Sequence, residues 1–458
     1  MPSTGPSESQ TGTASGAILR RQAFRYRLYP TPEQEAFFRQ IAGCCRFVSN
    51  LALEQRRIFG RPGRNINYAS QCKELAALKD AAPFLHDVPH HCLQQALRDR
   101  DRGFQRFFRG EGGYPKPRRR GENDSFRFPD PLQFRLEPDP AGDARYASLI
   151  LPKLGKRQGD LGGIRLRLHR PVLGTVKTIT IARDGAWWVA SLATERAVAV
   201  PEHASPSAVG VDLGVVHPIA CSNGTVPYPR RPSTPREERR LARLQRQASR
   251  KRRGSNNRRK ALARVAALKA RVRRRRQDLV HKATTMLAQN HGLILVEDLR
   301  VRAMTASARG SVEEPGSNVR QKAGLNRSLL DVGFAEIRRQ LGYKTAWLGG
   351  RLLAVPAAYT SQTCSHCGRV DGASRVERGL FVCAGCGIVL HADVNAGCNI
   401  LRRGLAMLGL SPAQVEEIML ERAGGLPVPA CGGLGVTRPV KQEPVTARRG
   451  SPVIYGGK

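Results

Sequence analysis

Four cysteines in two closely spaced pairs are the strongest chemical signal in the sequence. Cys364 and Cys367 form one C-x-x-C pair, and Cys383 and Cys386 form a second, with fifteen residues between the pairs. Each pair can bring two thiolates of one tight turn to a single ion, and this spacing is typical of tetrahedral zinc sites. Four unrelated cysteines or two disulfides are the alternatives. We expect structural zinc, because two such pairs in a chain without a secretory signal are difficult to explain without a metal.

Three carboxylates could form a second kind of metal site. Asp212 lies in the apolar run Ala208–Gly214, and Glu297 ends the similar run Leu293–Glu297, so both runs resemble buried strands. A carboxylate in a buried strand is costly unless it is paired or binds a metal. Asp393 alone could be a helix N-cap or a solvated loop residue. Together the three could bind two divalent cations and cleave a phosphodiester, and oxygen ligands favour Mg²⁺ or Mn²⁺ over zinc.

The charge of the chain is extreme. Its 458 residues contain 76 Lys and Arg against 37 Asp and Glu, which gives a formal net charge of +39. This excess predicts a polyanionic partner; nucleic acid is favoured, and an anionic membrane surface is the alternative. We expect a cytoplasmic protein without a membrane partner, because the sequence has neither an apolar run long enough to span a bilayer nor the features of a signal peptide. The seven remaining cysteines show no paired framework, as expected in a reducing compartment.

Two segments concentrate basic residues. Pro235 to Arg276 contains nineteen Lys and Arg, and its apolar residues predict two helices broken near Gly254. Acids there are too few for the pairing that a solvated helix uses, so phosphates are the favoured counter-charge. A predicted strand around residue 166 carries two arginines on one face, for which an ordinary solvated face is the alternative. The predicted nucleic-acid contacts are Arg165, Arg167, Arg252, Arg253, Arg258, Arg259, Arg273, Arg274, Arg275 and Arg276.

The hydrophobic periodicity changes along the chain and predicts its parts. Helical spacing gives way to short alternating strands, which indicate a small antiparallel sheet or barrel with a helical insertion. The strand Phe24–Tyr29 could belong to that sheet. The predicted parts are a disordered tail (1–18), the sheet with its insertion (19–205, insertion about 31–115), a domain with buried strands and the cysteine segment (206–402, segment 359–390), and a disordered carboxy-terminal tail (403–458).

Several motifs resemble, in order and spacing, the OrfB/TnpB family of bacterial insertion sequences, which is related to type V CRISPR effector nucleases. They are GVDLGVVHPIACSNG, ILVEDL, YTSQTCSHCG, FVCAGCG and HADVNAGCNI. The segment YRLYPTPEQEAFFRQIAGCCRFVSNLAL is similar to the family's amino-terminal helical motif, so the resemblance covers residues 20 to 405. One departure is His391, at a position where the family often has an acidic residue.

The resemblance implies an α/β and α+β multidomain fold. A RuvC-like (RNase H-type) nuclease domain with an inserted zinc ribbon would follow a wedge β-barrel with a helical recognition insertion. The implied activity is Mg²⁺- or Mn²⁺-dependent DNA cleavage directed by a guide RNA in a bacterial cytoplasm. Asp212, Glu297 and Asp393 would be catalytic, and the four paired cysteines would bind zinc. The alternatives are a transposase or recombinase that acts without guide RNA, and a non-catalytic zinc-containing regulator that binds nucleic acid.

Overall fold

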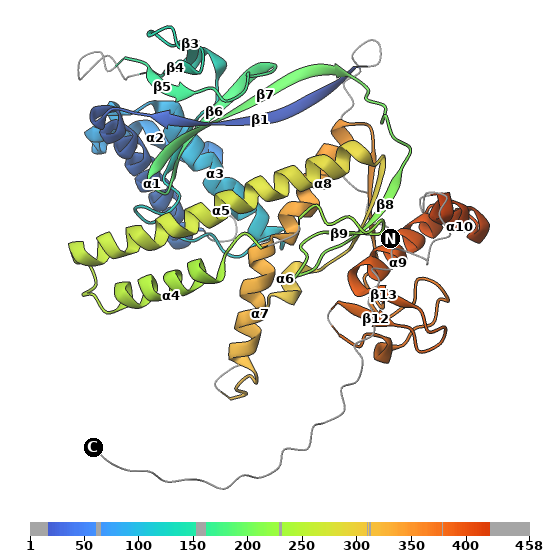
Figure 1. Cartoon of the computed structure of the whole chain (residues 1–458). Coiled ribbons are helices and arrows are strands. Elements are labelled where there is room, and N and C mark those ends of the chain that lie inside the picture. The colour runs from blue at the N-terminus through green and yellow to red at the C-terminus, as the bar shows by residue number, and fades with distance from the viewer. Residues whose placement is uncertain are drawn as a thin grey trace, which may run out of the picture. The chain divides into compact units, whose positions relative to one another are not determined.

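The computed structural model of the chain forms two compact units, whose elements are labelled in Figure 1. Unit 1 contains the residues up to Pro201 together with Ser233–Arg274, and unit 2 contains Glu202–Pro232 and the residues from Arg275 onward. No helix in the part of the chain that the structure describes is both long and apolar enough to cross a bilayer. The described residues are 17–60, 66–152, 162–228, 231–308, 310, 313–377 and 379–421.

Unit 1 is organised by an antiparallel sheet of seven strands in the order β2-β6-β7-β1-β5-β4-β3. β1 lies inside the sheet between β7 and β5, and its residues Phe24, Tyr26 and Leu28 are buried on one face. The edge strands β2 and β3 do not pair with each other within the described residues, so the sheet is a half-barrel. The strands are β1 (Ala17–Tyr29), β2 (Ser125–Phe128), β3 (Arg135–Pro138), β4 (Tyr146–Ile150), β5 (Ile164–Arg167), β6 (Thr175–Asp184) and β7 (Trp187–Ala199).

Three helices lie between β1 and β2 in sequence: α1 (Pro32–Phe59), α2 (Tyr68–Ala81) and α3 (His90–Phe108). Thr31 caps α1, and its partner in the capping box is Gln34. Phe38 of α1 is fully buried and packs against Phe126 and Trp188 of the sheet, so helices and sheet share one core. Short 3-10 helices lie at Pro83–Asp87 and Pro131–Gln133.

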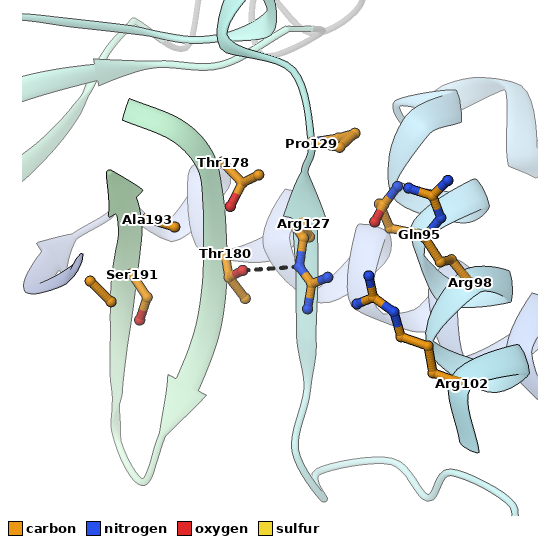
Figure 2. Close-up of a pocket in the computed structure, with 10 residues that line it drawn as sticks. Gln95, Arg98, Arg102, Arg127, Pro129, Thr178, Thr180, Ser191 and Ala193 are labelled. Carbon is orange, nitrogen blue, oxygen red and sulfur yellow. Dashed lines mark hydrogen bonds between the residues drawn. The ribbon is translucent and has the colours of Figure 1, made fainter. Parts of the chain in front are cut away.

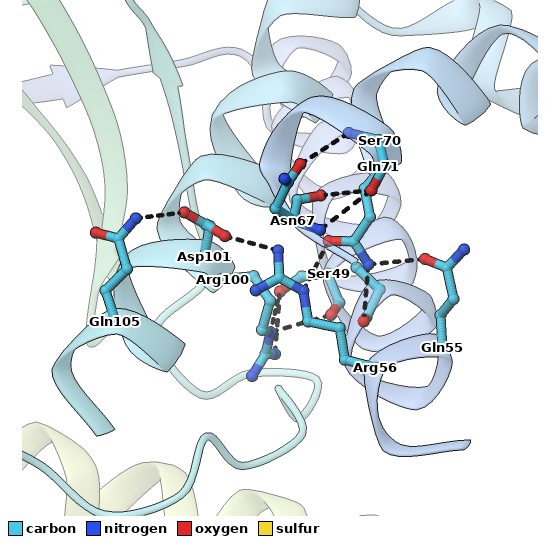
Figure 3. Close-up of polar contacts among 10 residues, drawn as sticks. Ser49, Gln55, Arg56, Asn67, Ser70, Gln71, Arg100, Asp101 and Gln105 are labelled. Atoms are coloured by element: carbon cyan, nitrogen blue, oxygen red, sulfur yellow. Dashed lines mark hydrogen bonds and ion pairs between the residues drawn. The ribbon is translucent and has the colours of Figure 1, made fainter. Parts of the chain in front are cut away.

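Two arginines fasten these helices to one another (Figure 3). Arg100 of α3 is buried and donates hydrogen bonds to the carbonyl oxygen and hydroxyl of Ser49 in α1. Arg56 of α1 donates to Asp101 of α3 at 2.7 Å and to Gln71 of α2 at 3.1 Å. Burial, followed by the charges of nearby arginines, lowers the pKa of Arg100 to about 10. The guanidinium therefore stays charged at neutral pH inside the helical layer.

A basic helical hairpin completes unit 1. It consists of α4 (Pro235–Ser249) and the first half of α5 (Asn256–Asn290), which pack through a small apolar cluster of Leu241, Leu244, Val265 and Leu268. The two predicted helices are present, but the second continues without a break to Asn290. This hairpin groups with unit 1, whereas the sequence placed residues 206–402 in one domain. Sequence periodicity does not report which sheet a helix packs against.

Unit 2 contains a four-stranded sheet in the order β11-β10-β8-β9. β8 (Ala208–Asp212), β10 (Leu293–Glu297) and β11 (Arg351–Val355) are parallel, and β9 (Ala220–Cys221) is antiparallel to β8. Both faces are covered, which explains the nearly continuous apolar strands. One face packs against the end of α5, α7 (Val319–Val332) and α8 (Phe334–Trp347). The other packs against α9 (Ala392–Met407) and α10 (Pro412–Glu421).

The remaining elements of unit 2 are short. They are α6 (Val301–Met304), a 3-10 helix at Gly372–Ser374, and the hairpin of β12 (Leu380–Val382) and β13 (Val389–His391). The end of α9 and all of α10 lie inside the predicted carboxy-terminal tail, and Val415 of α10 is buried against α9. The rest of that tail, and the predicted tail before residue 17, lie outside the described residues.

Replacing Arg100 by Met should lower the free energy of unfolding by about 1–3 kcal/mol, because the buried oxygens of Ser49 lose their donor. Arg102→Met, at an exposed position on the same helix, is the matched control and should change it by at most about 0.5 kcal/mol. Urea-induced unfolding of the full-length chain measures both. Equal midpoints for the two variants would contradict the structural role of Arg100.

Candidate functional site

Three carboxylates line one cavity of about 800 Å³ in unit 2. Asp212 ends β8, Glu297 ends β10, and Asp393 lies in the first turn of α9. Because β8 and β10 are parallel neighbours, their carboxyl ends meet at the same edge of the sheet. The structure therefore brings together the three acids that the sequence singled out.

The helix that carries Asp393 lies unusually close to the first strand. A Cβ atom added to Gly210 of β8 would lie 2.0 Å from the carbonyl oxygen of Gly397 in α9. A Cβ atom on Gly397 would lie 2.8 Å from the amide nitrogen of Ser222. Only glycine permits such an approach. Asp393 is one helical turn before Gly397 and shares its face, so this contact carries Asp393 toward the end of β8.

Negative charge accumulates in this cavity. Burial, followed by repulsion from Glu297 and Asp393, raises the pKa of Asp212 to about 7, and Arg375 opposes this effect. Burial also raises the pKa of Glu297, although the hydroxyl of Thr360 donates a hydrogen bond to this carboxylate. Carboxylates that repel one another in a partly buried site are a strong attraction for cations.

Two histidines flank Asp393. Nδ1 of His217 lies 2.8 Å from Oδ2 of Asp393, and the amide N–H of Asp393 donates to Nδ1 of His391 at 3.3 Å. One donor atom from each of the three residues lies within 4.8 Å of the others. The sequence offered little signal for this cluster, because His217 is a single histidine in a loop 176 residues before Asp393.

The four paired cysteines also converge. Their sulfur atoms lie within 4.8 Å of one another, with Cys364 to Cys386 at 3.8 Å and Cys367 to Cys383 at 3.5 Å. Four sulfurs around one zinc ion would be separated by about 3.8 Å. The amide N–H of Cys386, and then that of Gly385, lower the pKa of Cys383 to about 6, which favours the thiolate. None of the ten cysteines among the described residues forms a disulfide.

Two buried asparagines of α9, the helix that carries Asp393, hydrogen-bond to residues 360–365, which are called the cysteine loop here because they lead into the first cysteine pair. Asn395 accepts a hydrogen bond from the amide of Ser365 and donates one to the carbonyl of Thr363, both at 2.8 Å. Asn399 donates to the carbonyls of Thr360 and Thr363. These residues were not predicted as functional, although their four-residue spacing in VNAGCN places them on one helical face.

Several of the predicted nucleic-acid arginines have partners inside the protein. The guanidinium carbon of Arg274 lies 4.2 Å from the ring centroid of Trp187, and Arg165 pairs with Asp139 at 3.2 Å. The remaining members of the run at residues 273–276 are also engaged: Arg273 pairs with Asp184, Arg275 donates to the carbonyl of Pro232, and Arg276 pairs with Asp331. Six of the ten side chains are exposed, those of Arg165, Arg167, Arg252, Arg253, Arg259 and Arg273, and the other four are half-buried. At the hairpin turn, Arg258 donates to the carbonyls of Ala248 and Lys251, and Arg259 donates to the side chain of Asn256.

A basic pocket in unit 1 was not predicted (Figure 2). It has a volume of about 440 Å³ and lies between α3 and one face of the sheet. Arg127 of β2 donates to the hydroxyl of Thr180 at 3.3 Å, and Asp99 lies 3.5 Å from the same guanidinium. In the sequence, the only sign of this pocket is the four-residue spacing of Arg98 and Arg102, which places both on one face of α3. The lining residues are Ala23, Gln95, Arg98, Arg102, Arg127, Pro129, Thr178, Thr180, Ser191 and Ala193.

Models of known protein families match three parts of the chain. The OrfB model of IS605-type elements, described as a probable transposase, matches residues 191–308. The Cas12f1-like TNB domain matches residues 334–400, and a helix-turn-helix domain model matches residues 20–58. In this structure the last of these segments consists mainly of β1 and α1.

Full-length relatives are similar over nearly the whole chain. InsQ of Escherichia coli (strain K12), named as a candidate RNA-guided DNA endonuclease, is 40% identical over 431 residues, which are 93% of this chain and 98% of InsQ. A Streptomyces pristinaespiralis protein with the same designation is 32% identical over 444 residues, 94% of this chain and 98% of that protein. A cryo-EM structure of a Cas12f1–sgRNA–target DNA complex is similar in fold, with a TM-score of 0.50 at 14% identity over 84% of this chain and 98% of that chain.

Proposed function

Since this chain belongs to the OrfB/TnpB family of insertion-sequence proteins, we propose that it is an RNA-guided DNA endonuclease that cleaves phosphodiester bonds in the cavity of unit 2. The observation that supports this most strongly is the meeting of Asp212, Glu297 and Asp393 at one cavity. A parallel pair of strands with acids at their carboxyl ends, followed by a helix with a third acid, fits a RuvC-like nuclease domain.

The carboxylates fit a pair of divalent cations. The three acids outnumber the two arginines that line the cavity, Arg231 and Arg375, and carboxylate oxygen atoms are ligands that Mg²⁺ and Mn²⁺ accept. Bound ions of this kind activate water and stabilise the leaving oxygen. Asp212, Glu297 and Asp393 would hold them. The hydroxyl of Thr360 orients Glu297, and the imidazole of His217 orients Asp393 through their hydrogen bonds.

We assign structural zinc to the cysteine cluster, which makes residues 359–390 a zinc ribbon. Four thiolates fill the four positions of a tetrahedral ion and leave none for a substrate. The asparagine contacts of Asn395 and Asn399 indicate what the ribbon does for catalysis. By holding the first two turns of α9, it would keep Asp393 in place.

Guide RNA and target DNA would bind to the exposed basic surfaces of unit 1, which serves as the wedge and recognition part of the chain. The turn of the α4–α5 hairpin and the pocket walled by Arg98, Arg102 and Arg127 are suited to phosphates because their hydroxyl and guanidinium groups are hydrogen-bond donors. Charge of this kind recognises the backbone, and base pairing with the guide would supply the sequence specificity.

A transposase that acts without guide RNA is the second candidate, and the description of the matching family model favours it. Both candidates use the same acids, so cleavage alone does not separate them. The protein purified from its native host should carry one defined transcript if it is RNA-guided. A non-catalytic regulator would have no need for three acids at one cavity.

Changing Asp212, Glu297 or Asp393 to Ala should each reduce DNA cleavage by at least about 10³-fold, because a two-metal site fails as a unit, and the losses should not be additive. Asp298→Ala is the matched control, since this neighbouring carboxylate pairs with Arg338 instead of lining the cavity. Binding of RNA and DNA should change little in all four variants. Cleavage by Asp393→Ala at the parental rate in Mg²⁺ would contradict the assignment.

The engaged and exposed arginines give a test of nucleic-acid binding. Replacing Arg252, Arg253, Arg258 and Arg259 with Gln should reduce the slope of log affinity against log salt for a mixed-sequence DNA duplex by up to about 3.6, since each phosphate contact contributes about 0.9. Gln at all four positions 273–276 is the comparison. This variant should lower the free energy of unfolding, because ion pairs inside the protein are lost, and it should leave the slope nearly unchanged. If only the second set flattened the slope, the hairpin turn would not be a phosphate surface.

Cys383→Ser should lower the zinc content of the purified chain well below one ion, because the remaining ligands no longer complete the tetrahedral site. Amide hydrogen exchange in α9 should become faster, since the ribbon holds the start of this helix. Cys72→Ser, a free cysteine of unit 1, is the control. Mass-spectrometric metal analysis that finds one zinc per chain in Cys383→Ser would overturn the zinc assignment.

A further inference from the structure

Asp393 differs from the other two carboxylates in its neighbours, because it contacts the imidazoles of His217 and His391. His217 lies in the loop between β8 and β9, and His391 ends β13 and caps α9. The two ring centroids are 5.5 Å apart. Three segments of unit 2 that are distant in sequence thus place two nitrogen donors and one carboxylate within 4.8 Å.

We infer that His217, His391 and Asp393 form a mixed nitrogen and oxygen site that binds a first-row transition-metal ion in preference to Mg²⁺. The inference rests on the proposed function only in taking Asp393 as a metal ligand. Mg²⁺ requires oxygen ligands in near-octahedral geometry, whereas imidazole nitrogen suits the transition metals. Two histidines with one carboxylate are a recurrent ligand set for divalent transition-metal ions.

The hydrogen bonds in the cluster orient the rings and leave nitrogen available. Each histidine uses Nδ1 in the contact with Asp393, and neither Nε2 has a hydrogen-bond partner among the described residues. The side chain of His217 is 32% exposed and lines the cavity, while that of Asp393 is 13% exposed. An ion that enters the cavity can therefore reach His217 and Asp393, and the half-buried His391 lies beside them.

A purely orienting role for the histidines is the competing explanation. A hydrogen bond from His217 would hold Asp393 in place whether or not the imidazole touches an ion. The two explanations differ in one physical property: only direct coordination couples the electron spin of a paramagnetic ion strongly to an imidazole nitrogen. Mn²⁺ is a suitable probe because it is paramagnetic and because it binds nitrogen more weakly than the later transition metals do, which makes the test stringent.

The experiment uses the full-length chain, with zinc loaded on the cysteines, the affinity tag removed and no nucleic acid. Electron paramagnetic resonance gives the Mn²⁺ affinity in an excess of Mg²⁺, and electron spin echo modulation reports coordinated nitrogen. His217→Gln keeps a donor for Asp393, and His391→Asn keeps a helix cap, so both variants remove the imidazole with little cost to folding. His86→Gln in unit 1 is the control.

The parent and the control should show nitrogen modulation and equal Mn²⁺ affinity. Each site variant should bind Mn²⁺ at least about tenfold more weakly and lose part of the modulation. The inference is overturned if the parent binds no Mn²⁺ in competition with Mg²⁺, if it binds Mn²⁺ without nitrogen modulation, or if both variants retain the parental affinity.

Cleavage by Asp393→Ala, measured beside Mn²⁺ binding to the parent, distinguishes failure of this inference from failure of the nuclease proposal. Mn²⁺ bound without nitrogen coupling, together with lost cleavage in Asp393→Ala, would remove the nitrogen site and leave the nuclease intact. Nitrogen coupling together with normal cleavage by Asp393→Ala would support the metal site and contradict the catalytic assignment.

Discussion

The burial of neighbouring carboxylates at the end of a sheet is the constraint around which unit 2 is built. Burial and the neighbouring acids raise the pKa of Asp212 from 3.8 to about 7, which corresponds to roughly 4 kcal/mol against its ionised form. Folding of the chain does not by itself offset this free-energy cost. Its persistence makes sense if cations enter the cavity, because the same repulsion then becomes the source of their binding energy. The surrounding contacts hold together a site that would otherwise separate.

Helix α9 is the element that opposes this separation. Gly397 allows the backbone of α9 to contact β8. Asn395 accepts a hydrogen bond from the cysteine loop, and both Asn395 and Asn399 donate hydrogen bonds to backbone carbonyls of that loop. The face that carries Asp393 is therefore held by a strand on one side and by a ribbon on the other. Because both contacts depend on backbone atoms, they fix the helix position closely. The cysteine cluster is thus coupled mechanically to the carboxylate cavity although it lies outside it.

The sequence was sufficient where the signal was local, and insufficient where it depended on distant partners. A carboxylate at the end of an apolar strand is visible in a few residues, as is a pair of C-x-x-C turns, so the acids and cysteines could be chosen in advance. Membership of the OrfB/TnpB family, predicted from the motifs, is confirmed by a relative that is 40% identical over most of the chain. The contact between His217 and Asp393 spans 176 residues and has no local pattern. Likewise, nothing near Arg273 indicates that its partner is Asp184.

That pairing changes how the charge of the chain should be understood. Asp184 is buried and accepts hydrogen bonds from both Arg25 of β1 and Arg273 of α5, and the ring of Trp187 lies beside Arg27 and Arg274 at 3.8 and 4.2 Å. A buried acid with two guanidinium partners is an anchor whose loss would leave charge uncompensated. The base of the α4–α5 hairpin is therefore fastened to the sheet by arginines. Arginines that look equivalent in sequence thus differ in their surroundings, because Arg273 and Arg274 contact Asp184 and Trp187, whereas Arg252 and Arg253 are exposed at the turn of the hairpin.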